Sequence, residues 1–154
     1  MLTQEEQTDI LAEVKRYPYK RAACPEALKI VQRYRGWISD QTLCEVAEFL
    51  DMTPAELDSI ATVYNLIFRR AVGRHVILVC DSVVCWILGY EQLLEHLQKR
   101  LGVGLGETTA DKKFTLLPVC CIGACDEAPA MMLDGRLYGK LTPEKIDAIL
   151  GECA

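Results

Sequence analysis

The pattern of apolar and polar positions changes once along the chain, near Gly73. Before this point, apolar residues recur every three or four positions, as they do on one face of a helix. This pattern predicts four helices, over residues 3–17, 25–36, 40–50 and 54–64. Because these helices are short, amphipathic and joined by short links, residues 1–72 are predicted to form a small helical bundle.

Local signals support the starts and ends of these helices. Thr3 can cap the first helix, and the segment Thr53-Pro54-Ala55-Glu56 matches a capping box with proline at the first helical position. Pro25 lies where a first-turn proline is tolerated, and Gly36 is expected to end the second helix.

After Gly73 the pattern indicates strands. Residues 75–80 (HVILVC) and 114–119 are short apolar runs typical of buried strands, with a helix over 90–101 and a loop over 102–113 between them. Residues 131–133 and 136–138, joined by Asp134-Gly135, predict a hairpin, and a last helix runs from Pro143 to about Leu150. This order predicts an α+β fold with a small sheet and helices packed on it over residues 73–154.

Composition and charge exclude several classes of protein. The chain has 154 residues, of which 51% are hydrophobic, and this argues against disorder. Its net charge is −5 and its basic residues are scattered, which argues against nucleic acid as a partner. The acidic start MLTQEEQTDI does not resemble a signal peptide, and no apolar run reaches the ~20 residues of a membrane helix. We therefore expect a soluble intracellular protein without direct membrane insertion.

Eight cysteines without a secretion signal indicate metal binding or redox chemistry rather than a disulfide framework. Cys80 and Cys85 have C-x4-C spacing, and Cys121 and Cys125 have C-x3-C spacing. Each pair follows a predicted strand. If these two strands are parallel neighbours, both loops leave the same sheet edge and four thiolates can converge. Four thiolates can hold a [2Fe–2S] cluster, a [4Fe–4S] cluster or a zinc ion.

The spacing of the cysteines favours one of these sites. Structural zinc prefers tight C-x2-C knuckles, whereas two wider loops, one per iron, suit a [2Fe–2S] cluster. Gly123 allows a close turn in which amide N–H groups can face sulfur, and Ser82 can donate to a sulfur as well.

The remaining candidates carry weaker signals. No C-x2-C motif occurs, which argues against a thioredoxin-type dithiol, and residues 102–106 (GVGLG) lack the spacing of a nucleotide-binding loop. The two histidines, His75 and His96, are expected to be structural. The same is expected of three isolated cysteines, Cys24, Cys44 and Cys153.

Three stretches of the sequence carry a resemblance to a known family. GRHVILVCDSVVC (73–85), GETTADKKFTLLPVCCIGACDEAP (106–129) and LTPEKID (141–147) resemble the [2Fe–2S] subunits of respiratory NADH-quinone oxidoreductase (complex I). ALKIVQRYRGWIS (27–39) and IATVYNLIFRRAVGRH (60–75) are similar to the helical N-terminal region of these subunits. The resemblance implies a thioredoxin-like [2Fe–2S] ferredoxin domain behind an N-terminal helical bundle.

The resemblance also implies the site and the partners. The implied cluster ligands are Cys80, Cys85, Cys121 and Cys125, so that Cys121 rather than Cys120 belongs to the C-x3-C pair. The implied partners are a flavin subunit, which binds FMN and NADH, and a large iron–sulfur subunit. In that setting the chain accepts one electron from FMN during NADH oxidation with quinone reduction, on the cytoplasmic side of the inner membrane.

Three alternative functions remain open. Related subunits serve NAD-linked hydrogenases and formate dehydrogenases, a zinc-stapled interaction module would use the same four cysteines, and a free-standing ferredoxin would work alone.

Asp81, Asp126 and Glu127 flank the cysteines, and no Lys or Arg lies within the motifs. Since reduction adds negative charge to the cluster, a low reduction potential is expected.

Overall fold

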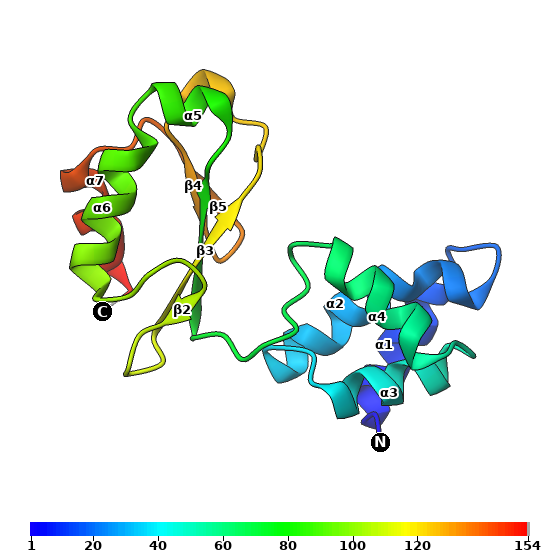
Figure 1. The fold of residues 1–154 in the computed structure, drawn as a ribbon. Helices are drawn as coiled ribbons and strands as arrows, with labels where there is room; N and C mark the ends of the chain where they lie inside the picture. The colour runs from blue at the N-terminus through cyan, green and yellow to red at the C-terminus, as the bar shows by residue number, and fades with distance from the viewer. Residues whose placement is uncertain (154) are drawn as a thin grey trace. The chain divides into compact units, whose positions relative to one another are not determined.

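The structure is a computed structural model, and it describes residues 1–153. The chain forms two compact units, one over Met1–Ala71 and one from Val72 onward (Figure 1). Within the described residues, no helix combines the length and the apolar character needed to span a membrane.

The first unit is helical. Its elements are α1 (Gln4–Val14), the short 3-10 helix η1 (Lys20–Ala23), α2 (Cys24–Arg35), α3 (Asp40–Phe49) and α4 (Pro54–Val63). Thr3 and Thr53 both form capping boxes, and Gly36 caps α2 with a positive φ of 82°, as predicted from the sequence. The first helix ends at Val14, three residues before the predicted end, and η1 was not predicted.

A buried ion pair connects the helices of this unit beside an apolar core. Glu6 on α1 is 1% exposed, and its carboxylate accepts hydrogen bonds of 2.6 and 2.7 Å from Arg35 at the end of α2. Arg35 also donates to Glu45 on α3 at 2.9 Å. The guanidinium therefore compensates the buried charge and holds three helices together.

The second unit contains a mixed sheet of five strands. They are β1 (His75–Cys80), β2 (Glu107–Thr108), β3 (Phe114–Val119), β4 (Met131–Leu133) and β5 (Arg136–Tyr138), and their order in the sheet is β2-β3-β1-β4-β5. β1 and β3 are parallel, and the other neighbours are antiparallel. The four predicted strands are confirmed, while the two-residue strand β2 was not predicted.

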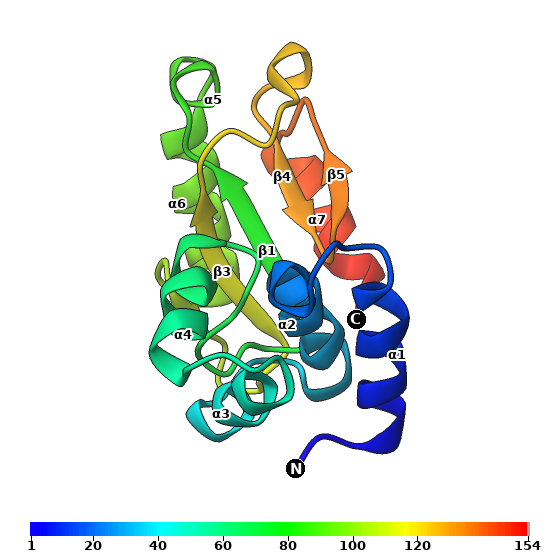
Figure 2. The ribbon, with the colours of Figure 1, turned by 90° about the vertical axis from the view of Figure 1, so that its right-hand side faces the viewer.

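Two helices cover one face of this sheet. α6 (Tyr90–Leu101) and α7 (Pro143–Glu152) lie together on that face (Figures 1 and 2), and their apolar residues share a core with those of β1, β3 and β4. His96 of α6 lies 3.1 Å from Asp147 of α7, and His75 lies 2.6 Å from Asp134, so both histidines have structural partners. A third helix, α5 (Val83–Ile87), follows β1 directly and was not predicted.

Candidate metal centre

Parallel pairing of β1 and β3 brings the two cysteine loops to one edge of the sheet. Cys80, the last residue of β1, is in register with Val119, the last residue of β3. α5 and the short 3-10 helix η2 (Cys125–Glu127) consequently lie at the same end of the sheet (Figure 2). The strand arrangement on which the four-thiolate prediction depended is therefore present.

The four predicted ligands form two pairs of thiols. Cys80 and Cys85 are each only 2% exposed, and they pack with Ala124 and Ala130 in a small apolar cluster. The Sγ atoms of Cys121 and Cys125 lie 3.5 Å apart at the surface. One pair is thus shielded from water, and the other faces it.

The two pairs are near each other, because Ala124, which precedes Cys125, packs in the same apolar cluster as Cys80 and Cys85. Burial is the main cause that raises the pKa of the Cys85 thiol to about 11, and smaller contributions come from Cys80 and Cys125. The pKa of Cys125 is raised chiefly by its hydrogen bond with Cys121, and Cys80 contributes as well. Within residues 1–153, no three His, Cys, Asp or Glu side chains are placed to hold a single metal ion.

Backbone N–H groups face the sulfurs. The amide of Gly123 donates to Cys121 Sγ at 3.4 Å, and it is the main cause that lowers the pKa of this thiol. Gly123 has a φ of +82°, a conformation that favours glycine, as the sequence indicated. The backbone of Ala130 makes a smaller contribution that lowers the pKa of Cys85, and the Ser82 hydroxyl makes one that lowers the pKa of Cys121. These donors stabilise thiolate charge, which is the form that binds a metal.

A contact that sequence reasoning missed holds the second cysteine loop in place. Gly139, just after β5, packs so closely on the loop that a Cβ atom there would lie 2.6 Å from Glu127 Oε2 and 2.8 Å from the Glu127 carbonyl oxygen. The amide of Lys140 donates to that same carbonyl at 2.5 Å, and the amide of Leu141 donates to the Pro129 carbonyl at 3.1 Å. The only sequence signal was a glycine directly after a predicted strand.

These features fit an iron–sulfur cluster. The donor set is four thiols in two pairs, with amide groups directed at the sulfurs and one pair shielded by apolar residues. Each iron of a [2Fe–2S] cluster takes two thiolates, and N–H donors and burial tune such clusters. Asp81, Asp126 and Glu127 are exposed around the thiols and add negative charge there.

The remaining cysteines are not among the four predicted ligands. Cys24 is buried at the start of α2, Cys44 is exposed on α3, and Cys153 donates to the Ile149 carbonyl at 3.6 Å. Cys120 is exposed beside Cys121, and the expectation that it does not bind the cluster stays a prediction.

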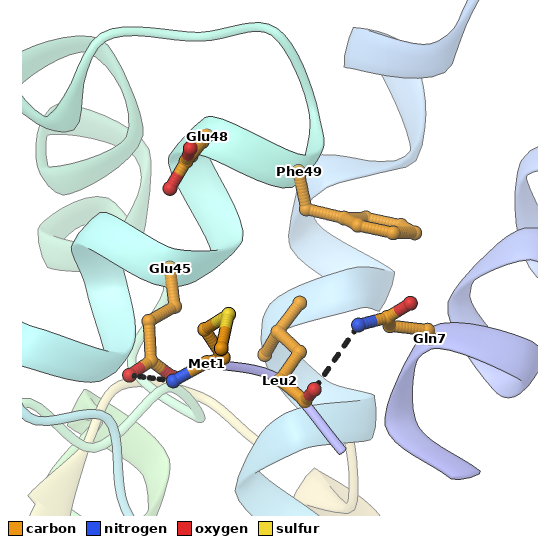
Figure 3. A pocket seen from close by; sticks show the side chains of 6 residues that line it. All are labelled: Met1, Leu2, Gln7, Glu45, Glu48 and Phe49. Atoms are coloured by element: carbon orange, nitrogen blue, oxygen red, sulfur yellow. Dashed lines mark hydrogen bonds and ion pairs between the residues drawn. The ribbon is translucent and has the colours of Figure 1, made fainter. Parts of the chain in front are cut away.

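A pocket in the first unit offers no comparable chemistry. It has a volume of about 250 Å³ and is lined by Met1, Leu2, Gln7, Glu45, Glu48 and Phe49 (Figure 3). Two polar contacts lie within it: Glu45 accepts from the N-terminal ammonium at 2.7 Å, and the Gln7 amide donates to the Leu2 carbonyl at 3.0 Å.

Comparison with known proteins agrees with this site. A family model described as thioredoxin-like [2Fe–2S] ferredoxin matches residues 10–154. The E subunit of NADH-quinone oxidoreductase from Pseudomonas aeruginosa is 47% identical over 97% of this chain and 90% of its own length, and the Escherichia coli K12 protein of that name is 46% identical over the same shares. A solved NAD+-reducing [NiFe]-hydrogenase matches 85% of this chain with 27% identity and a TM-score of 0.73, although the match spans only 22% of the hydrogenase chain. This chain belongs to the thioredoxin-like [2Fe–2S] ferredoxin family.

Proposed function

We propose that this chain is the [2Fe–2S] electron-transfer subunit of an NADH-quinone oxidoreductase. The observation that carries the proposal is the placement of two thiol pairs at the carboxyl ends of the parallel strands β1 and β3. Relatives named as the E subunit of that enzyme, 46–47% identical over nearly the whole chain, support the assignment.

In this proposal Cys80 and Cys85 hold one iron, and Cys121 and Cys125 hold the other. A bound [2Fe–2S] cluster takes up and releases one electron. The amide N–H of Gly123 and the hydroxyl of Ser82 stabilise negative charge at Cys121, whereas the exposed carboxylates Asp81 and Asp126 oppose further reduction.

The chain relays an electron and transfers no hydride. Hydride chemistry belongs to a partner subunit that carries FMN and binds NADH, and a large iron–sulfur subunit completes the module. We place the chain on the cytoplasmic side of the inner membrane, within a membrane-bound complex. Residues 1–72 would then form its helical bundle and residues 73–154 its ferredoxin domain.

A second parent complex is supported by one observation. The likeness to the NAD+-reducing [NiFe]-hydrogenase favours a hydrogenase diaphorase module as the alternative setting, and a formate dehydrogenase is a related one. The higher identity to the NADH-quinone oxidoreductase relatives, over nearly their whole length, favours the quinone-reducing complex.

The test of the cluster is the content of iron, acid-labile sulfide and zinc in anaerobically purified protein. We expect about two irons and two sulfides per chain. Zinc without sulfide would instead identify a structural interaction module and would remove the electron-transfer role. A cluster-containing chain that never co-purifies with a flavin subunit would be a free-standing ferredoxin.

Two cysteine variants test the ligand assignment. We expect Cys121→Ser to lose the cluster, because an alcohol is a poorer iron ligand than a thiolate. Cys120→Ser is the matched control, since it makes the same change one residue away. The assignment fails if Cys120→Ser loses iron and sulfide while Cys121→Ser keeps them.

A further inference from the structure

A hydrogen bond from α7 holds the segment that packs against the second cysteine loop. The ammonium of Lys145, in the first turn of α7, donates to the Gly139 carbonyl at 2.6 Å. The amide of Lys140 belongs to the same peptide group, and it donates to the Glu127 carbonyl at 2.5 Å. This single peptide group therefore accepts from a charged donor on one side and donates to the loop on the other.

The chain of hydrogen bonds continues to a proposed cluster ligand. The Glu127 carbonyl shares its peptide group with the amide of Ala128, and that amide donates to the Cys125 carbonyl at 3.4 Å. Both peptide groups thus direct their N–H ends away from Lys145 and toward Cys125. Hydrogen bonds in such a chain polarise one another, and a charged donor at its start strengthens them.

Lys145 lies at a position where the helix itself favours the opposite charge. Thr142 caps α7, so Lys145 is the third helical residue. In the capping boxes of α1 and α4, this third position is a glutamate. A cation near the N-terminus of a helix is unfavourable, because that end carries a partial positive charge. A residue that opposes the preference of its own helix indicates a role outside it, and the contact of Lys145 with Gly139 supplies one.

The second cysteine loop has no cation of its own. No Lys or Arg occurs over residues 114–135, and Asp126 and Glu127 are exposed on η2. An added electron increases the negative charge that this loop must tolerate. Lys145 supplies positive charge from a different element, and the aligned peptide groups extend its effect to Cys125.

We propose that Lys145 is a positioning residue for the second pair of cluster ligands, acting on Cys125 through this chain of hydrogen bonds. The inference rests on the proposed function. By fixing the peptide group that bonds the Glu127 carbonyl, Lys145 keeps η2 in place against α7. By polarising the chain, it also favours the uptake of an electron at the site.

Three variants of the full-length chain test this role. Lys145→Met removes the ammonium, and Lys145→Arg keeps the charge and the N–H donors. Lys140→Met is the matched control, because it removes one charge from the same segment but leaves the Lys140 amide and the bond from Lys145 in place. For each anaerobically purified chain we would measure iron and sulfide content, the rate at which a chelator removes iron, and the midpoint potential by redox titration.

We expect Lys145→Met to release iron roughly tenfold faster than the unaltered chain, the size expected when one hydrogen bond from a charged group is lost. Its midpoint potential should become more negative, because positive charge that favours reduction is removed. Lys145→Arg should resemble the unaltered chain in both measurements. Lys140→Met should keep the release rate of the unaltered chain and shift the potential less than Lys145→Met does.

Two results would overturn the inference. The first is a cluster-containing Lys145→Met chain with an unchanged midpoint potential, because a merely structural lysine would affect stability alone. The second is a Lys140→Met chain that changes as much as Lys145→Met, since charge without the hydrogen bonds would then account for the effect. If Lys145→Met held no cluster, Lys145→Gln would replace it, because it keeps an N–H donor without the charge, and an unchanged potential there would count equally. Failure of the proposed function is distinct, because the unaltered chain would then contain no iron and sulfide.

Discussion

Replacing Gly139 by alanine should weaken binding of the proposed cluster without changing any of its four predicted ligands. The new Cβ would lie 2.8 Å from the carbonyl oxygen of Glu127, whereas ordinary contact begins at 3.4 Å. The loop must therefore retreat by the difference between these values, about 0.6 Å, and further contacts with the Glu127 side chain add to this displacement. Functional groups must be held within ~0.5 Å of their working positions, so Cys125, two residues away, is displaced enough to matter.

The size of the effect follows from two opposing contributions. Overpacking a tight contact costs about 1–3 kcal/mol. Alanine also reduces the freedom of the unfolded chain, and this stabilises the folded state by about 0.4–1 kcal/mol. The net destabilisation is about 1–2 kcal/mol, which corresponds to a roughly 5- to 30-fold change in an equilibrium.

The assay is the rate at which a chelator removes iron from the purified chain, followed by the visible absorption of the cluster. We expect Gly139→Ala to lose its cluster roughly 5 to 30 times faster than the unaltered chain. Gly151→Ala is the matched control, because nothing lies within 4 Å of a Cβ built there and helical alanine is favourable. Equal rates for Gly139→Ala and Gly151→Ala would refute the reasoning.

Four further predictions concern the site and the first unit. Ser82→Ala should shift the midpoint potential while the iron and sulfide content stays unchanged, because the Ser82 hydroxyl stabilises charge at Cys121. Redox titration together with metal analysis checks this prediction, and loss of iron would contradict it. The unaltered chain should titrate at a negative midpoint, and a positive one would show that charge does not dominate the site. Arg35→Met should lower the free energy of unfolding by about 3 kcal/mol in urea titrations, because it leaves Glu6 buried and unpaired. The hydrogen bond from Arg35 holds the pKa of Glu6 below its usual 4.5. The stabilisation from this pair is therefore complete above pH 4.5 and is lost as pH falls through the lower pKa that Glu6 has in the folded protein. The free energy of unfolding of Glu6→Gln should depend less on acid pH, and an unchanged dependence would contradict this reasoning.

Local signals explain which elements were predictable from the sequence. Thr3 and Thr53 cap helices through residues only three positions away, so their effect is visible in a short segment. The partner of Glu6 lies 29 positions along the chain, and nothing near Glu6 indicates that it is buried. α5 was missed because its five residues, VVCWI, have no polar face and therefore no helical periodicity.

The candidate site could be predicted from the sequence only on the assumption that two of the strands pair in parallel. The spacing of the cysteines identified the pairs, but their convergence depended on β1 and β3 being parallel neighbours. Neither strand's sequence specifies its neighbour, because pairing is decided by the whole sheet. The role of Gly139 was hidden for a similar reason, since the loop that it supports is distant in the sequence.

The parallel pairing of β1 and β3 also sets an order of maturation. Before these strands pair, a [2Fe–2S] cluster delivered to the chain meets only one pair of thiols, either Cys80 with Cys85 or Cys121 with Cys125. If the four predicted cysteines are the ligands, complete ligation requires the two strands to be paired. A cluster held by the four predicted cysteines would join two loops about 40 positions apart, and by analogy with a disulfide of that span it would restrict the unfolded chain by about 4 kcal/mol. A bound cluster would thereby add to the stability of the folded second unit.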